Sequence, residues 1–176
     1  MSRLPLFELP DGAEPPALKL FRMVAHAESA YAPWLRYGGA LLTRLELDPV
    51  LRELAILQVA RLVDSEYEWV QHDPIARAVG VRAEQIAAVE AGRDDDAAFD
   101  RDEALVLRVT RAAVTRGAAE EADVVELARL LDPRQVVELL LVVGNYVAIA
   151  MLIASTGLEP DPPLDAAQLL GDGDER

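Results

Sequence analysis

Residues 48–80, which read DPVLRELAILQVARLVDSEYEWVQHDPIARAVG, hold the strongest helix signals in the chain. They open with Asp48-Pro49, a capping residue followed by the residue that suits a first helical turn, and the apolar run that follows reaches Val63. Asp64-Ser65 is a second cap, and the helix that it opens is expected to end at Gly80, where glycine can adopt a left-handed conformation. The stretch therefore predicts two consecutive helices joined by a short turn.

Similar start and stop signals recur along the rest of the chain, and no segment has a convincing strand pattern. Caps, apolar spacing and terminal glycines predict further helices at 17–28, 33–45, 82–91, 100–117, 120–131 and 133–157. We therefore expect an all-α helical bundle forming a single domain over residues 17–158. The proline-rich residues 1–16 are expected to be an extended arm, and the acidic residues 159–176 a solvated, mobile tail.

The composition excludes several classes of function. The chain has 17 Lys and Arg against 31 Asp and Glu, a formal net charge of −14. This charge opposes binding to nucleic acid, because each phosphate contact needs a cation. The chain has no cysteine, which excludes disulfides, thiolate nucleophiles, iron–sulfur clusters and cysteine zinc sites.

The distribution of apolar residues predicts the location and the assembly of the protein. The N-terminal residues lack the apolar segment of a signal peptide, so a cytoplasmic protein is expected. Residues 136–154 are nearly long enough to span a bilayer, but they contain Glu138, Gly144 and Asn145, so a wholly buried helix is favoured and no membrane partner is expected. Hydrophobic residues make up 52% of the chain, more than one small bundle readily buries, which predicts a homo-oligomer.

Three side chains of residues 48–80 could perform acid–base chemistry. Glu68 and His72 are four residues apart and share one helix face, with Ser65 one turn earlier. A carboxylate beside an imidazole fixes the ring tautomer and prepares it for proton transfer. Glu53, on the preceding helix, has apolar neighbours, so its carboxyl group should be partly buried and must be paired or protonated.

The same residues also have structural explanations. Ser65 followed by Glu68 matches a capping box, in which the glutamate has no catalytic role. Tyr67 and Trp69 are residue types that often serve only in packing, and spacing alone favours these structural explanations. His26, with no acidic residue one turn away, is expected to be structural.

A metal site formed by Glu53, Glu68 and His72 is a further alternative. Three ligands are a plausible count for a catalytic site, but one histidine among carboxylates is a weak zinc signature. No bound metal is therefore expected.

The spacing of four positions resembles the signature of the carboxymuconolactone decarboxylase family, which has the AhpD-like all-helical fold. The peroxidase branch of that family reads Glu, eleven residues, Cys, two residues, Cys, three residues, His. On this chain the four positions are Glu53, Ser65, Glu68 and His72, so both cysteines are replaced while the glutamate and histidine keep their spacing.

The resemblance covers roughly residues 15–158, including family-like features at residues 81–86 and at Asn145-Tyr146. It implies assembly as a trimer or hexamer. Because Ser65 and Glu68 cannot form or reduce a disulfide, thiol peroxidase activity is excluded. The decarboxylase branch needs no cysteine, and it implies loss of carbon dioxide from a small carboxylated lactone without a metal or organic cofactor.

The resemblance also suggests roles for individual residues. His72 is expected to be the general acid and base, Glu68 to orient it or share its proton, and Glu53 to set its protonation state. The residues expected to bind a small-molecule substrate are Ser65, Tyr67, Trp69 and Tyr146.

Two questions stay open at the level of the sequence. An anionic substrate needs a cation, which could come from Arg52, from Arg61 or from another subunit. The chain could also be a non-catalytic, oligomeric binding or scaffold member of the same fold.

Overall fold

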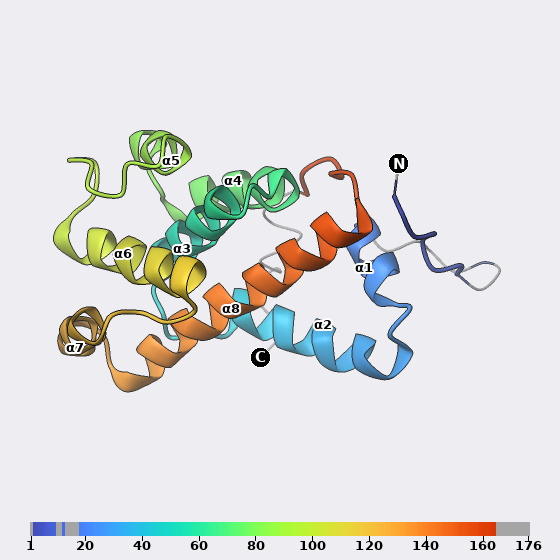
Figure 1. The fold of residues 1–176 in the computed structure, drawn as a ribbon, viewed down its shortest axis with the longest axis horizontal. Coiled ribbons are helices and arrows are strands. Elements are labelled where there is room, and N and C mark those ends of the chain that lie inside the picture. Colours follow the sequence, from blue (N-terminus) through green and yellow to red (C-terminus); the bar gives the residue numbers. More distant parts are fainter. Residues whose placement is uncertain (1, 10–11, 13–17, 165–176) are drawn as a thin grey trace.

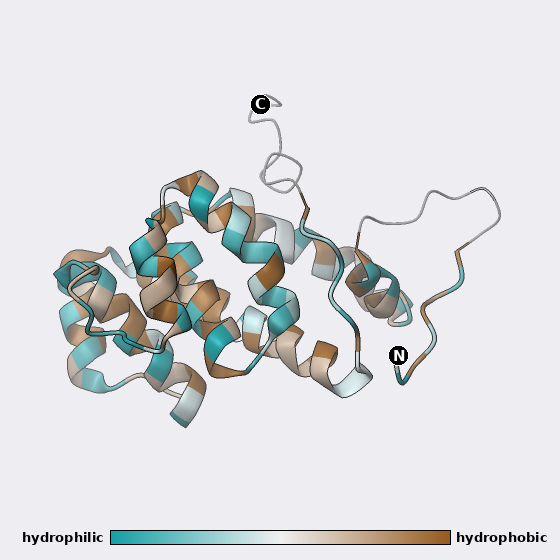
Figure 2. Ribbon diagram, turned by 90° about the horizontal axis from the view of Figure 1, so that it is seen from above, coloured by the Kyte–Doolittle hydropathy of each residue, from teal (hydrophilic) through white to brown (hydrophobic). Residues whose placement is uncertain are grey.

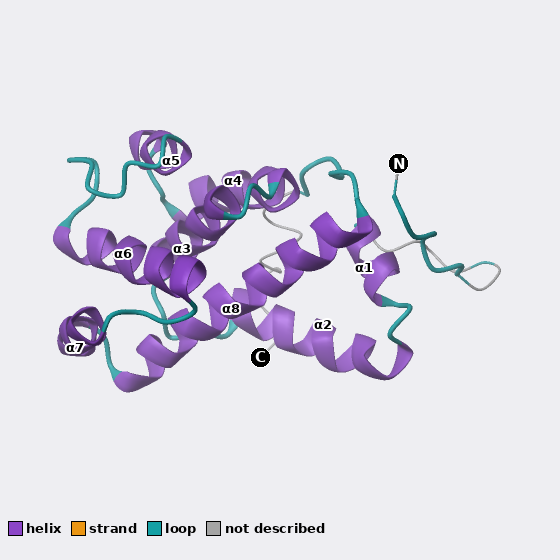
Figure 3. Ribbon diagram, viewed as in Figure 1, coloured by secondary structure: helices purple, strands orange, loops and turns teal. Residues whose placement is uncertain are grey.

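The computed structural model describes residues 2–9, 12 and 18–164 of the 176-residue chain, and this part is helical with no strand (Figure 3). The prediction of an all-α domain is therefore confirmed for these residues. Their helices are α1 (Lys19–Val24), α2 (Glu28–Thr43), α3 (Pro49–Leu62), α4 (Glu66–Val79), α5 (Ala83–Glu90), α6 (Arg101–Arg116), α7 (Glu121–Leu130) and α8 (Pro133–Thr156).

Most helix ends lie close to the capping residues that predicted them. The Asp48 carboxylate accepts hydrogen bonds from the first amides of α3, and Asp100 forms a reciprocal capping box with Glu103 at the start of α6. Helices α4 and α6 end at Gly80 and Gly117, whose φ angles are 107° and 80°. These backbone angles favour glycine because a Cβ atom would be strained there.

Helix α2 begins earlier than predicted. It was expected to open at Pro33, yet it begins at Glu28 and passes through that proline. The amides of Ala30 and Tyr31 bond to the carbonyl of Ala27 and close the first turn before the proline is reached. Pro33 therefore lies inside a helix that has already started, and the helix continues past it although proline has no amide hydrogen to donate.

Helix α3 is the centre of the fold. Every residue from Arg52 to Ala60 is buried, because α4, α5, α6 and α8 all pack against it. Leu54 and Leu57 belong to an apolar cluster shared with α5, whereas Ile56 belongs to the larger cluster shared with α6 and α8. The consecutive burial explains why this helix lacks an amphipathic pattern.

Helices α1 and α2 extend away from this centre, and α2 contacts α8 near one end and diverges from it toward the other (Figure 1). Leu41 is the one residue of α2 that is buried. The expectation that α8 is wholly buried is wrong, because it exposes large apolar side chains. These exposed residues are Val137, Leu140, Leu141 and Met151.

Helix α8 is also the one described helix long and apolar enough to span a membrane by length and composition. Half of its most apolar window is buried inside the protein. One such helix is weak evidence for a membrane span, because a core helix of a soluble protein can have the same length and composition.

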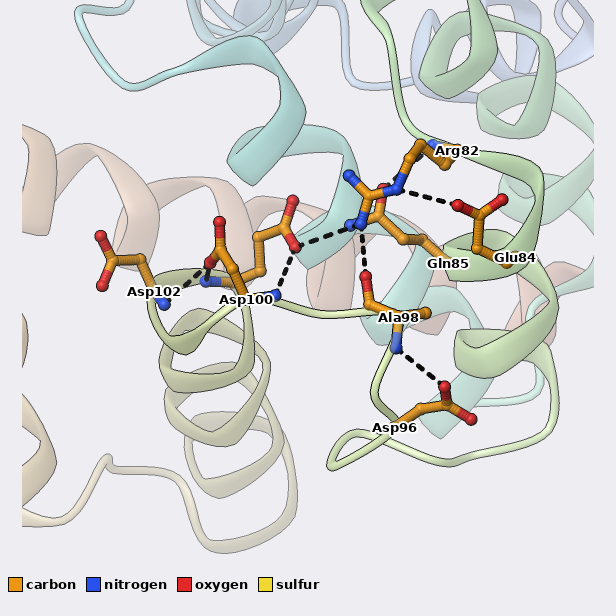
Figure 4. Close-up of polar contacts among 8 residues, drawn as sticks. Arg82, Glu84, Gln85, Asp96, Ala98, Asp100 and Asp102 are labelled. Carbon is orange, nitrogen blue, oxygen red and sulfur yellow. Dashed lines mark hydrogen bonds and ion pairs between the residues drawn. The ribbon is translucent and has the colours of Figure 1, made fainter.

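The acidic loop between α5 and α6 is held in place by Arg82 (Figure 4). Its guanidinium donates to the carbonyl of Ala98 and to the carboxylate of Glu84, and it lies 3.8 Å from Glu103. Asp96 accepts from the amide of Ala98 and shapes the loop from within. The loop is therefore tied to the starts of both neighbouring helices.

The described parts of both chain ends contact the helical domain. In the extended N-terminal arm, the amide of Arg3 donates to the carbonyl of Thr156 at 2.6 Å, and the carbonyl of Pro5 lies 2.8 Å from Nε2 of His26. After α8 the chain runs back as an extended segment (Figure 2), and residues 159–164 pack on the domain. The expected mobile tail therefore does not begin at 159, and residues 165–176 lie outside the described part of the chain.

Candidate functional site

A buried chain of polar contacts joins α3 to α4. Nδ1 of His72 lies 2.8 Å from Oε2 of Glu53, and Oε1 of Glu53 accepts from Nε of Arg52 at 2.9 Å. The Arg52 guanidinium also donates to the carbonyl of Leu42 at 2.7 Å. Glu53 is fully buried, and both of its oxygens are committed to these two partners.

The partners of Glu53 decide its charge. Burial alone would raise the pKa of this carboxyl, but His72 and Arg52 outweigh it and hold the pKa below its ordinary value. An ionised Glu53 accepts the hydrogen on Nδ1 of His72, which assigns Nε2 as the ring nitrogen that can exchange a proton. The Tyr146 ring contacts the imidazole edge-on, with 4.7 Å between ring centroids, and fixes its other side.

A cavity of about 360 Å³ lies beside His72, between α1, α2, α4, α8 and the segment after α8. Its walls are mostly apolar, and among the described residues that line it there is no lysine or arginine. The polar or aromatic-hydroxyl side chains on its wall are Tyr67, Glu68, Gln71, His72, Asn145 and Tyr146. A small, largely apolar molecule is the type of ligand that such a cavity accommodates.

Glu68 lines this cavity in a different state from Glu53. Its residue is 2% exposed, and neither carboxyl oxygen has a hydrogen-bond partner among the described residues. Burial raises the pKa of Glu68 to about 8, and the nearby Ser65 hydroxyl offsets this only in part, without a hydrogen bond of normal geometry. Glu68 is therefore mainly a neutral carboxylic acid at pH 7.

Two expectations about Glu68 need correction. The capping box with Ser65 is not formed, because Ser65 makes no side-chain cap at the start of α4. The residue that holds His72 by a hydrogen bond is Glu53 and not Glu68. The physical reason is that α3 packs against α4 and brings Glu53 to Nδ1 of the ring.

The four residues expected to bind substrate divide into two pairs. Tyr67 and Tyr146 line the cavity beside His72. Ser65 and Trp69 instead line a separate surface depression on the other side of α4. Trp69 therefore lies away from the cavity, whereas the Ser65 hydroxyl is buried near Glu68.

The cationic partners proposed from the sequence do not line the cavity. Arg52 is buried against Glu53, and the guanidinium of Arg61 donates to the carbonyl of Glu90 on the far side of α4. No group of three or more His, Asp or Glu side chains suited to a metal ion occurs among the residues that the structure describes. Both carboxyl oxygens of Glu53 are already hydrogen-bonded to Arg52 and His72, so neither is free to bind a metal ion.

The segment after α8 closes one side of the cavity, which the sequence did not indicate. The Tyr67 hydroxyl donates to the buried Asp161 carboxylate at 2.7 Å, and Lys19 Nζ lies 3.2 Å from the same group. Gln71 donates to the Asp161 carbonyl and accepts from the amide of Leu164, which lines the cavity. Burial and Asp161 together raise the pKa of Tyr67, so its hydroxyl remains a donor.

Helix α2 contributes an unusual wall to the cavity. Gly38 and Gly39 lie inside this helix and line the cavity, and no atom beyond the neighbouring residues and the helix's own backbone lies within 4 Å of the position that a Cβ would take at either. Glycine inside a helix costs about 0.5–1 kcal/mol relative to alanine. Two adjacent helical glycines were thus a signal of free volume that could have been found in the sequence.

The fold and site define a class of protein: an all-helical domain in which a buried Arg–Glu–His chain borders an apolar cavity. Residues 28–112, from the start of α2 into α6, match the carboxymuconolactone decarboxylase family. The matched region contains both Glu53 and His72. A comparison of the chain with curated proteins found no match.

Proposed function

We propose that the protein is a cofactor-independent enzyme that performs acid–base chemistry of the lyase type on a small organic acid or lactone. The observation that carries this proposal is the contact of His72 with an ionised, buried Glu53, at the wall of an apolar cavity. An imidazole held in one tautomer with its second nitrogen available is the usual arrangement for proton transfer.

The chain's residues would divide the work as follows. Arg52 keeps Glu53 ionised, and Glu53 holds Nδ1 of His72 and stabilises the positive charge that forms on the ring. Nε2 then donates a proton to the substrate carbon, or accepts one from it. The apolar walls limit access of water to the reacting groups.

Loss of carbon dioxide from a carboxylated lactone is one reaction that fits this scheme. The bond between the ring carbon and the carboxylate breaks, carbon dioxide leaves, and the electron pair is delocalised through the ring double bond onto the lactone carbonyl. A proton from Nε2 of His72 then forms a new carbon–hydrogen bond on the ring. No lysine or arginine is found among the described lining residues, so His72 is the lining side chain that gains a positive charge when it accepts a proton.

We further propose that the working form is a cytoplasmic homo-oligomer, a trimer or hexamer. The exposed apolar side chains of α8 and the sparse burial of α2 support association with further copies of the chain. The alternative of a purely binding or scaffold protein would also use this surface, so assembly does not discriminate between the two functions.

The test of the enzymatic proposal is turnover by the variants His72→Gln and Glu53→Gln. The assay measures carbon dioxide release from carboxymuconolactone, together with deuterium incorporation into the product in D₂O. Each substitution is expected to lower kcat by about 10²–10⁴-fold, the usual contribution of a general acid or base. Glu66→Gln, an exposed position on α4, is the matched control and should behave as wild type.

Folding is checked by thermal unfolding of each variant, because Glu53→Gln removes the charge that balances Arg52. If the folded His72→Gln variant turned over substrate as fast as wild type, the acid–base proposal would be wrong.

A further inference from the structure

We infer that Glu68 acts as a neutral hydrogen-bond donor to the carbonyl oxygen of the ligand, and that the cavity takes small, largely apolar carbonyl compounds. The ligand's carbonyl oxygen would lie at Glu68 and its adjacent carbon at His72. This inference rests on the proposed function for the role of His72, whereas the binding role of Glu68 can be tested separately.

The first argument is the unmatched carboxyl group. Glu68 is 2% exposed, it lines the cavity, and both of its oxygens lack a partner among the described residues. Buried polar groups in proteins nearly always have a hydrogen-bond partner, so one that lacks it needs an explanation. A ligand in the cavity would supply the missing partner.

The second argument concerns the charges around Glu68. On α3 the nearby ionisable groups are Arg52 and Glu53, and on α4 and α8 they are His72, Tyr67 and Tyr146. Arg52 and His72 are both bonded to Glu53, and Tyr67 donates to Asp161. Among the described residues no lysine or arginine lines the cavity, and Arg52, whose guanidinium keeps one buried nitrogen without a partner, makes no hydrogen bond with Glu68.

The cavity walls contributed by α1 and α2 add no charged group near Glu68. The described residues of these two helices that line the cavity are apolar, aromatic or glycine. Burial in these surroundings raises the pKa of Glu68 to about 8, so at neutral pH its carboxyl group carries a hydrogen. A carboxylic acid in this state can donate a hydrogen bond to a carbonyl oxygen, as it does in other enzymes that stabilise enolates.

The third argument is the position of Glu68 relative to His72. The two residues are one turn apart on α4 and both line the cavity, so their side chains can reach adjacent atoms of one small ligand. When His72 removes a proton from the carbon next to the carbonyl, the carbon–hydrogen electron pair forms a carbon–carbon double bond. The carbonyl π electrons then move to the oxygen, where the Glu68 hydroxyl stabilises them, and return of the proton reverses the step.

The same donor serves a decarboxylation. The electron pair released by the departing carbon dioxide moves to the same carbonyl oxygen, and His72 supplies the proton to carbon. Glu68 therefore provides the electron-accepting contact that Glu53, committed to Arg52 and His72, cannot provide.

The experiment uses cyclohexanone as the carbonyl probe and methylenecyclohexane, which has the same shape without the oxygen, as the control ligand. Binding is measured by NMR titration, and the probe's carbonyl stretch by infrared difference spectroscopy. Wild type and Glu68→Gln, which keeps a donor, are expected to bind cyclohexanone and lower the stretching frequency. Glu68→Leu should lose this shift and bind about two- to tenfold more weakly, the effect of one neutral hydrogen bond.

Methylenecyclohexane, which cannot accept a hydrogen bond from Glu68, should bind Glu68→Leu no more weakly than it binds wild type. Cyclohexanone affinity of the wild type should also fall as the pH rises through about 8, because Glu68 then loses the donated hydrogen, whereas Glu68→Gln should show no such fall. Thermal unfolding confirms that each variant is folded. Equal affinity and an equal carbonyl shift in wild type and Glu68→Leu would overturn the inference.

The two proposals fail in different ways. Unchanged turnover in His72→Gln, with Glu68-dependent binding of cyclohexanone intact, would overturn the proposed acid–base function and leave the donor role of Glu68. Loss of turnover in His72→Gln, with binding that does not depend on Glu68, would overturn the donor role alone.

Discussion

The two sides of the α3–α4 pair are built in opposite ways. On the side facing α5 and α6, Leu54 and Leu57 have no exposed surface. On the side facing α1 and α2, the protein holds a cavity of about 360 Å³, and α2 buries Leu41 alone among its residues. The densely packed side fixes where α3 and α4 place their polar side chains, and the open side leaves room for a ligand next to them.

The two buried glutamates follow this division. Glu53 has two partners that keep its pKa low, so it is charged and rigidly held. Glu68 faces the open side, has no partner, and has a pKa raised to about 8. Identical side chains one helix apart thus differ in charge because of their neighbours, which is how one fold can present both a fixed anion and a neutral acid.

The largest expected effect is a loss of stability when a buried leucine on the packed side is replaced by alanine. Leu57→Ala should lower the free energy of unfolding by about 3 kcal/mol, because a fully buried leucine leaves a cavity that its surroundings cannot fill. Leu35→Ala, at a partly buried residue of α2 that already borders the cavity, should cost about 1 kcal/mol. Urea unfolding of both variants measures the difference.

Equal losses in these two variants would contradict the division into a packed and an open side. A change of denaturant m-value in either variant would show that the denatured state, or the two-state character of unfolding, had also changed.

A smaller effect is expected from the pH dependence of stability. The pKa of Glu68 is about 8 in the folded chain and near 4.5 when it is unfolded. Between these values the unfolded chain releases the proton and the folded chain keeps it, so the stabilising contribution is complete below pH 4.5 and is lost as the pH rises toward 8. From pH 5 to pH 7, wild type should lose about 2–3 kcal/mol relative to Glu68→Gln.

The comparison with Glu68→Gln isolates this contribution, because Glu53 is present in both proteins. Glu53 works in the opposite direction: its lowered pKa gives stability that is present above the unfolded pKa and lost in acid. Urea unfolding at pH 5, 6 and 7 provides the measurement. Parallel curves for wild type and Glu68→Gln would mean that Glu68 is ionised in the folded protein.

The sequence was sufficient for the helical class of the fold, for most of the helix ends and for the pairing of Glu53 with His72. Asp48, Asp100 and the C-terminal glycines act through local geometry, so their effects can be read from neighbouring residues. The spacing of Glu53 and His72 placed both residues on adjacent helices, and the structure brings them together at 2.8 Å.

The unpaired state of Glu68 and the partner of Tyr67 could not be predicted, because they depend on which segments pack together. Glu68 shares a helix face with His72, yet α3 supplies the carboxylate that the ring bonds. Tyr67 bonds Asp161, which is 94 residues away in the chain. Trp69 is on the face of α4 turned away from the cavity, which helical spacing alone cannot distinguish from the face turned toward it.

The smallest effect on the fold of one chain, and a decisive one for assembly, is expected on the exposed face of α8. Met151 is 65% exposed, and with Val137, Leu140 and Leu141 it forms one apolar side of this helix. Met151→Glu should change the stability of the isolated chain by no more than about 0.5 kcal/mol, because the side chain contacts mainly solvent there. If further copies cover this face, the same charge would be buried on assembly and would weaken it strongly.

Sedimentation velocity of wild type, Met151→Glu and Val125→Glu at micromolar concentration separates these outcomes. Val125 is an exposed apolar residue on α7 and serves as the matched control, with the wild-type oligomer expected. Met151→Glu should sediment as a monomer with unchanged helical content. A monomeric wild type would show instead that the open side, with its sparsely buried α2, is stable without a second copy, and the low burial of α2 would then be a property of the single chain.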